Sequence, residues 1–219
     1  FNISENNLNL NDTSFFFNNL DVFSKKTSLK KIKDSFFIKG SIDNKDISLN
    51  NTLINDFIKK NFPKLNPKNI NLNSKNIFSF KIDRKLKIED LYFSSEIKLN
   101  NLELTNHLAL DNFFPNINDH IKFNEHFIKI NYDKDVLSIK GNGNILIQNI
   151  DDNISYEIAY KDKVYNFFTS LDVNKNQIIV DFLKYKKKRD FKSNFKITGS
   201  YFPTDKILIN SFIYKENDN

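Results

Sequence analysis

Residues 154–160 read Ile154-Ser155-Tyr156-Glu157-Ile158-Ala159-Tyr160, and this stretch carries the pattern from which the fold follows. Apolar side chains occupy every second position, which places them on one face of a β-strand and the intervening Ser, Glu and Ala on the other. The same alternation recurs along most of the chain, with short polar breaks in between. The sequence therefore predicts a mainly β protein with one extensive apolar face.

The predicted strands follow one another with short polar connections. Breaks such as Asp83-Arg84-Lys85, Asp133-Lys134-Asp135 and Lys161-Asp162-Lys163 suit hairpin turns, so strands that are neighbours in sequence are expected to pair in a long antiparallel meander. Asp43-Asn44 is predicted to be one more two-residue turn. The clearest predicted strands are Leu8–Phe17, Phe36–Ile42, Lys45–Leu49, Ile121–Tyr132, Val136–Ile150, Ile154–Tyr160, Val164–Val173, Ile178–Tyr185, Phe191–Tyr201 and Lys206–Tyr214.

Residues 51–62 depart from the strand pattern. Apolar residues there recur at helical spacing, and Pro63 follows, so we expect one short amphipathic helix. A sub-boundary is expected near 63–70, within a single elongated β segment that spans 1–219. The chain contains no Met and residue 1 is Phe, so we expect it to be part of a longer chain.

The apolar face needs a cover. A large apolar side chain removed from water contributes about 1.5–3 kcal/mol, so leaving about ten of them wet would forfeit roughly 15–30 kcal/mol. Protein stability is only about 5–15 kcal/mol. Two arrangements answer this requirement: a closed β-sandwich, or an open groove (a β-taco) that holds a hydrophobic ligand. The 23 Phe and 8 Tyr residues suit both.

Several classes of chemistry find no support in the sequence. With no Cys, thiolate catalysis, disulfides and Cys-ligated metals are excluded. His107, His120 and His126 lack the spacing of a metal pair, and no nucleophile–base arrangement is recognisable, so we expect no enzyme, no metal and no cofactor. Gly141-Asn142-Gly143 lies inside a predicted strand and is interpreted, with Gly40 and Gly199, as a bulge or bend.

The basic balance of the chain is a compositional bias. Its net charge is +6, and Lys is strongly preferred over Arg, which occurs only twice. We therefore do not predict nucleic acid as a partner. One cluster is sharper than the rest, and it is either a contact for anionic lipid headgroups or a solvated hairpin loop. It consists of Lys184, Lys186, Lys187, Lys188 and Arg189.

The second half of the chain resembles the AsmA-like proteins of the Gram-negative envelope, which include the YhdP and TamB types. The resemblance lies in strand–Gly–strand units with polar turns, and it covers the chain best from about Ile121 to the end. The segments that carry it are Val136–Ile147, Ile154–Ile158, Tyr165–Thr169, Ile178–Tyr185 and Phe195–Gly199.

This resemblance implies an open β-groove in the periplasm, anchored in the inner membrane by a part of the protein outside this segment. Such a groove passively transfers phospholipid between the membranes, with acyl chains inside it and adjacent segments of the same chain extending it. The residues expected to line it are Ile145, Ile147, Tyr156, Ile158, Phe167, Leu171, Val180 and Ile197, with the basic cluster at the headgroups. The alternative is a β-sandwich binding or adhesion module with no lipid role.

Overall fold

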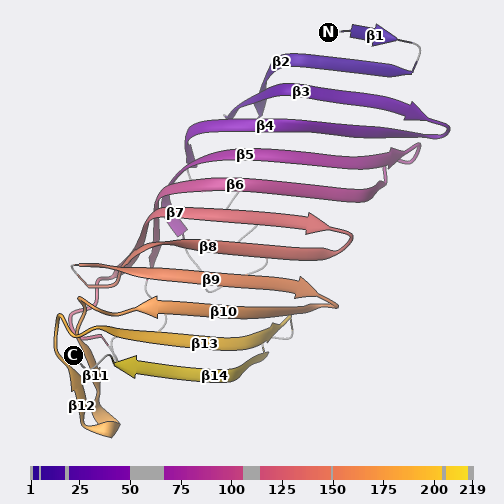
Figure 1. Cartoon of the computed structure of the whole chain (residues 1–219). Helices are drawn as coiled ribbons and strands as arrows, with labels where there is room; N and C mark the ends of the chain where they lie inside the picture. The colour runs from indigo at the N-terminus through magenta and orange to yellow at the C-terminus, as the bar shows by residue number, and fades with distance from the viewer. Residues whose placement is uncertain are drawn as a thin grey trace.

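The computed structural model describes residues 2–4, 6–17, 20–49, 67–105, 114–148, 150–203 and 206–216. Within these residues, twelve strands form one antiparallel sheet whose spatial order follows the sequence (Figure 1). They are β1 (Asn2–Ser4), β2 (Asn7–Phe17), β3 (Leu20–Ile32), β4 (Ser35–Leu49), β5 (Pro67–Asp83), β6 (Ile88–Thr105), β7 (His120–Asp133), β8 (Val136–Leu146), β9 (Asp151–Lys161), β10 (Val164–Asp172), β13 (Ser193–Phe202) and β14 (Lys206–Glu216).

The sheet order departs from the sequence at one point. β13 pairs with β10, and the residues between them form a separate hairpin made of β11 (Ile178–Val180), the 3-10 turn η2 (Asp181–Leu183) and β12 (Tyr185–Lys187). This hairpin lies beside the β14 end of the sheet (Figure 1).

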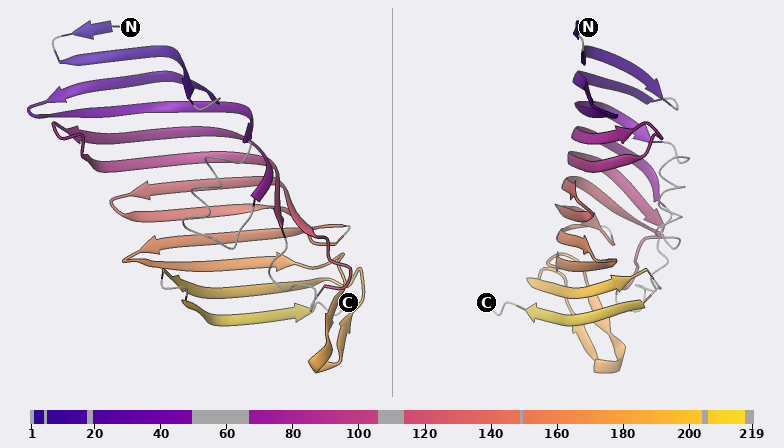
Figure 2. Two further views of the ribbon diagram at one scale, coloured as in Figure 1. Left: turned by 180° about the vertical axis from the view of Figure 1, so that it is seen from behind. Right: turned by 90° about the vertical axis from the view of Figure 1, so that its right-hand side faces the viewer.

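The predicted antiparallel meander is confirmed, and it is open. β1 and β14 are the outermost strands and do not pair with each other, so the sheet does not close into a barrel. Figure 2 shows the sheet as a single twisted and curved layer. No second sheet faces it among the described residues other than the small β11–β12 hairpin. The closed sandwich is therefore not the architecture of the described part of the chain.

The cross-strand register separates an apolar face from a polar one. Ile139, Ile158 and Phe167 are direct neighbours across β8, β9 and β10, so their side chains share what we call the inner face. The residues between them lie on the outer face, where neighbouring strands are joined by ion pairs. Lys140 meets Glu157 at 3.1 Å and Lys129 meets Glu96 at 3.0 Å. The outer face is thus the one suited to water.

The long strands bend where β-bulges interrupt the ladder. Asp46, Asn69 and Glu125 have φ values of 48°, 50° and 52° inside β4, β5 and β7, and the register shifts beside each of them. Burial at the bend is one-sided: His126 on the inner face is buried, whereas Glu125 and Phe127 beside it are exposed. The inner face is therefore the concave side of the bend.

The glycines serve the packing of aromatic rings on the inner face. Gly40, Gly141 and Gly199 lie directly opposite Phe78, Tyr156 and Phe167 in the register. A Cβ atom at each of these glycines would come within 2.8 Å of the facing ring. Gly143 meets the His126 ring in the same way. The predicted role in bulges is confirmed in part, because the register shifts at Gly199, but none of the glycines has a positive φ.

Several local predictions were wrong. β4 runs straight through Asp43-Asn44, because Asn44 pairs with Ser74 instead of turning the chain. The break predicted at 151–153 is the start of β9. The strand predicted over 178–185 is interrupted by η2. β3 was not predicted, because its lysines interrupt the alternation of apolar and polar residues. The predicted helix at 51–62 lies outside the described residues.

Candidate functional site

Four of the predicted lining residues lie on the open part of the inner face. Ile158 and Phe167 face each other across β9 and β10, and Tyr156 and Ile197 both face Thr169 from either side. All four are half-buried, so each keeps surface available for contact. The cross-strand row of Ile130, Ile139 and Ile158 extends this apolar surface to β7.

The other four predicted lining residues belong to a packed core at one end of the inner face. Ile145 and Ile147 are buried against Phe114 and Val173, and Leu171 and Val180 pack onto the same cluster. Ile147 is only 2% exposed, so it has almost no surface for a ligand. Four of the eight predicted residues therefore lie on the open apolar face and four belong to a conventional core, and contact with lipid stays a prediction.

His126 lies at the bend of the inner face and is fully buried. Its Nε2 donates to the Asn144 carbonyl oxygen at 2.9 Å. The ring lies edge-on to Phe123, with centroids 5.3 Å apart, and stacks with Tyr156 at 6.1 Å. Burial lowers the pKa of His126, so the neutral imidazole is favoured at this site. Sequence spacing gave no signal of this environment.

Tyr156 completes this aromatic group. Burial raises the pKa of its phenol to about 12, so the ring is un-ionised at physiological pH. Together, Phe123, His126 and Tyr156 form an uncharged aromatic cluster at the bend.

The basic cluster divides into one buried and four exposed side chains. Lys184, Lys186, Lys188 and Arg189 are exposed on the β11–β12 hairpin and after it. Lys187 is 1% exposed, and its Nζ donates to the carbonyl oxygens of Asn176 at 2.8 Å and Lys188 at 3.1 Å. Burial lowers the pKa of Lys187. The prediction that Lys187 contacts headgroups was therefore wrong.

Asp152 stabilises the loop before β11 through hydrogen bonds. Its carboxylate accepts the backbone N–H of Asn174 at 3.0 Å and the Asn176 side-chain amide at 2.6 Å. These bonds tie the loop that leads into β11 to the start of β9. Asp152 lies between two of the predicted strands, where a turn residue is expected, and it is a buried structural residue.

The described residues also line a hollow of about 560 Å³ on the outer face. Its walls include Asp43, Lys75, Glu96 and Lys129, which come from four neighbouring strands. Phe127 also lines this hollow, but charged side chains of both signs interrupt its apolar surface. The apolar inner face is therefore the better candidate site.

No family model matches this chain, and searches of curated proteins and of solved structures found no similar protein. The part of the chain that the structure describes contains no helix with the length and hydropathy to cross a membrane. Across the described ranges, no group of three or more His, Asp or Glu residues is placed to hold a metal ion.

Proposed function

We propose that the inner face of the sheet binds phospholipid acyl chains, and that the chain is a segment of an AsmA-like envelope protein. Binding is passive. Half-buried Ile, Phe and Tyr side chains contact the acyl chains, while headgroups stay in water near the exposed Lys184, Lys186, Lys188 and Arg189. No chemical step is part of this proposal.

The observation that carries the proposal is the single-layer architecture. Twelve strands at roughly 4.8 Å spacing make a sheet about 53 Å wide. Half a bilayer core is roughly 15 Å thick, so roughly three to four acyl chains placed end to end would match the width of the inner face.

The cellular setting follows from the resemblance. In this proposal the segment lies in the periplasm of a Gram-negative bacterium, an anchor elsewhere in the protein reaches the inner membrane, and adjacent segments of the same chain extend the apolar face. Lipid then moves between the membranes along that face.

The test is a face-specific pair of variants on β9. Ile158→Asp puts a carboxylate on the inner face, and Ala159→Asp puts one on the outer face, one residue away. We expect the purified wild-type chain and Ala159→Asp to carry phospholipid in native mass spectrometry. Ile158→Asp should lose it, because a charge in contact with acyl chains is costly.

Circular dichroism separates lipid loss from unfolding, since both variants should keep the β spectrum of the wild type. If Ile158→Asp does not fold, uptake of a fluorescent fatty acid by the wild type provides a second measurement. A lipid-free, stable wild-type monomer that takes up no fatty acid would contradict the proposal and favour a binding module with no lipid role.

A further inference from the structure

One end of the sheet consists of tight hairpin turns. The turns β3–β4, β5–β6, β7–β8 and β9–β10 all lie at the same side of the molecule, on the right in Figure 1. We call this side the turn end. It combines exposed apolar residues with a dense set of charged side chains, and the proposed acyl-chain binding does not use the turns themselves.

Leu86 is the most exposed apolar residue at the turn end, with 77% of its surface accessible. It lies in the β5–β6 turn with a φ of 61°, in the left-handed region that disfavours residues with a Cβ atom. A glycine or asparagine would suit this backbone better. Since Leu86 is so exposed, packing within the described residues does not explain why a leucine is present.

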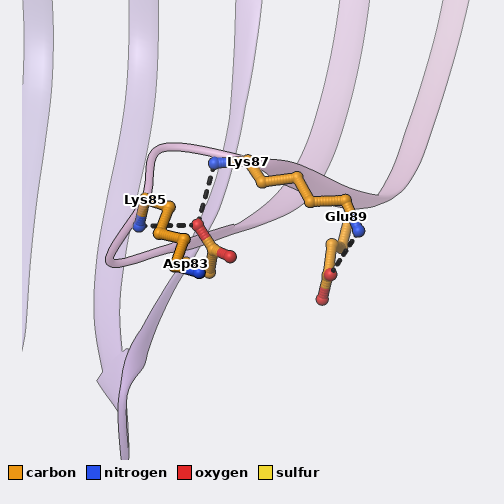
Figure 3. Close-up of polar contacts among 4 residues, drawn as sticks. All are labelled: Asp83, Lys85, Lys87 and Glu89. Carbon is orange, nitrogen blue, oxygen red and sulfur yellow. Dashed lines mark hydrogen bonds and ion pairs between the residues drawn. The ribbon is translucent and has the colours of Figure 1, made fainter.

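The turn that carries Leu86 is rigidly built (Figure 3). Asp83 Oδ1 accepts the backbone N–H groups of both Lys85 and Lys87 at 2.8 Å. The backbone adds two bonds, from Leu86 N to the Asp83 carbonyl at 3.0 Å and from Asp83 N to the Lys87 carbonyl at 3.1 Å. These four bonds hold the leucine outward, so its exposure is a fixed feature of the turn.

Cationic side chains surround Leu86. Arg84, Lys85 and Lys87 flank it in the turn, and Lys31 and Lys33 belong to the neighbouring β3–β4 hairpin. Two ion pairs offset part of this charge, because Asp34 pairs with Arg84 and Glu89 pairs with Lys87 at 3.3 Å. With Asp83 also counted, five basic side chains stand beside three acidic ones, so the local charge stays positive next to an exposed apolar side chain.

More apolar surface lies next to this turn. Phe36 and Ile88 both pair with Ile82 from either side, and both are exposed. Further along the turn end, Tyr160, Tyr165 and Tyr201 form a row across β9, β10 and β13, with ring centroids 4.5 Å and 6.0 Å apart. Tyrosine is favoured where an apolar region meets water, as at a membrane surface.

We infer that the turn end is a docking surface for an anionic phospholipid bilayer. Leu86 enters the boundary between headgroups and acyl chains, and the exposed Lys31, Lys33 and Lys85 of the two turns contact the anionic headgroups. Charge complementarity selects a lipid surface with negative charge, and the projecting leucine selects a surface with an accessible apolar interior. This inference does not depend on acyl-chain binding by the inner face.

The chain has no Trp, so a single introduced Trp reports its own surroundings. We expect the fluorescence of Leu86→Trp to shift to the blue with vesicles that contain phosphatidylserine, and to shift less with phosphatidylcholine alone or at high salt. The matched control is Ile77→Trp, at a position 58% exposed on the outer face of β5 and away from the turn. It should not shift.

Two further variants separate insertion from turn structure and from general charge. Leu86→Gly should stabilise the fold, because glycine adopts a positive φ without strain, yet weaken vesicle binding. Lys85→Gln should weaken vesicle binding about five-fold, which corresponds to about 1 kcal/mol per basic residue. Lys75→Gln removes an exposed lysine from the middle of β5 and should have little effect.

Equal shifts for Leu86→Trp and Ile77→Trp, or no shift for either, would overturn the inference. An equal shift of Leu86→Trp with a soluble polyanion such as heparin would also overturn it, because binding would then depend on charge alone. Ile158→Asp is expected to lose acyl chains but to keep binding vesicles. This result would support the docking surface independently of the proposed function.

Discussion

At the scale of single residues, the burial of His126 at the bend makes the stability of the fold depend on pH. An unfolded histidine has a pKa near 6.5, whereas burial lowers the pKa of folded His126. Below pH of about 6.5 the unfolded chain therefore binds a proton that the folded chain does not, and unfolding is favoured. The contribution of His126 to stability is complete above that pH and is lost as the pH falls.

Urea unfolding of the wild type and of His126→Gln between pH 8 and pH 5 measures this effect. Other groups also respond to acid, so the difference between the two proteins is the relevant quantity. The wild type should lose more stability than the variant as the pH falls below about 6.5. Parallel pH profiles would show that protonation of His126 has no part in the loss.

At the scale of elements, the turn between β9 and β10 holds a lysine in a conformation that favours glycine. Asp162 and Lys163 have φ values of 52° and 65°, the two positive angles of a type I′ turn. Asp suits the first of these positions, whereas glycine is preferred at the second. Lys163→Gly should therefore raise the free energy of unfolding by up to about 1 kcal/mol, through relief of this strain.

The control for this turn is Lys161→Gly, at the last position of β9, which pairs with Val164. Glycine within a strand costs about 0.5–1 kcal/mol, so this variant should be less stable. Urea midpoints for the two variants are expected to move in opposite directions. Movement in the same direction would contradict the turn geometry.

At the scale of the whole molecule, the sheet behaves as a linear array, because each strand pairs only with its neighbours within the described residues. Such arrays lose structure locally. In Gly199→Ala the new Cβ would lie 2.5 Å from the backbone oxygen of Leu208, a contact that a side-chain rotation cannot relieve. We expect a cost of about 1–3 kcal/mol.

Hydrogen exchange would show which strands lose stability in Gly199→Ala. Gly199→Ala should lose amide protection in β13 and β14 while β4 and β5 keep it. Gly40→Ala is the reciprocal variant, since its Cβ would meet Thr27 and Phe78, and it should lose protection in β3, β4 and β5. Uniform loss across the sheet in both variants would indicate a single cooperative unit instead.

The sequence determined the class of fold and the division of its faces. Alternation in Ile154–Tyr160 and its equivalents fixes which side chains share a face, because the period of two is a property of the extended backbone itself. Short breaks such as Asp133–Asp135 determine that neighbouring strands pair. The apolar face, and the position on its open part of four of the eight residues predicted to line it, were therefore readable before any coordinates.

Only the tertiary structure decided where that face bends, what is packed and what is exposed. The bulge at Glu125, the burial of Lys187 and the outward projection of Leu86 depend on backbone angles and on contacts between residues distant in sequence. A local pattern carries no record of those contacts. For this reason the sequence did not show that Lys187, within a basic run, is a buried structural residue. Nor did it show that Leu86, in a polar turn, is the most exposed apolar side chain at the turn end.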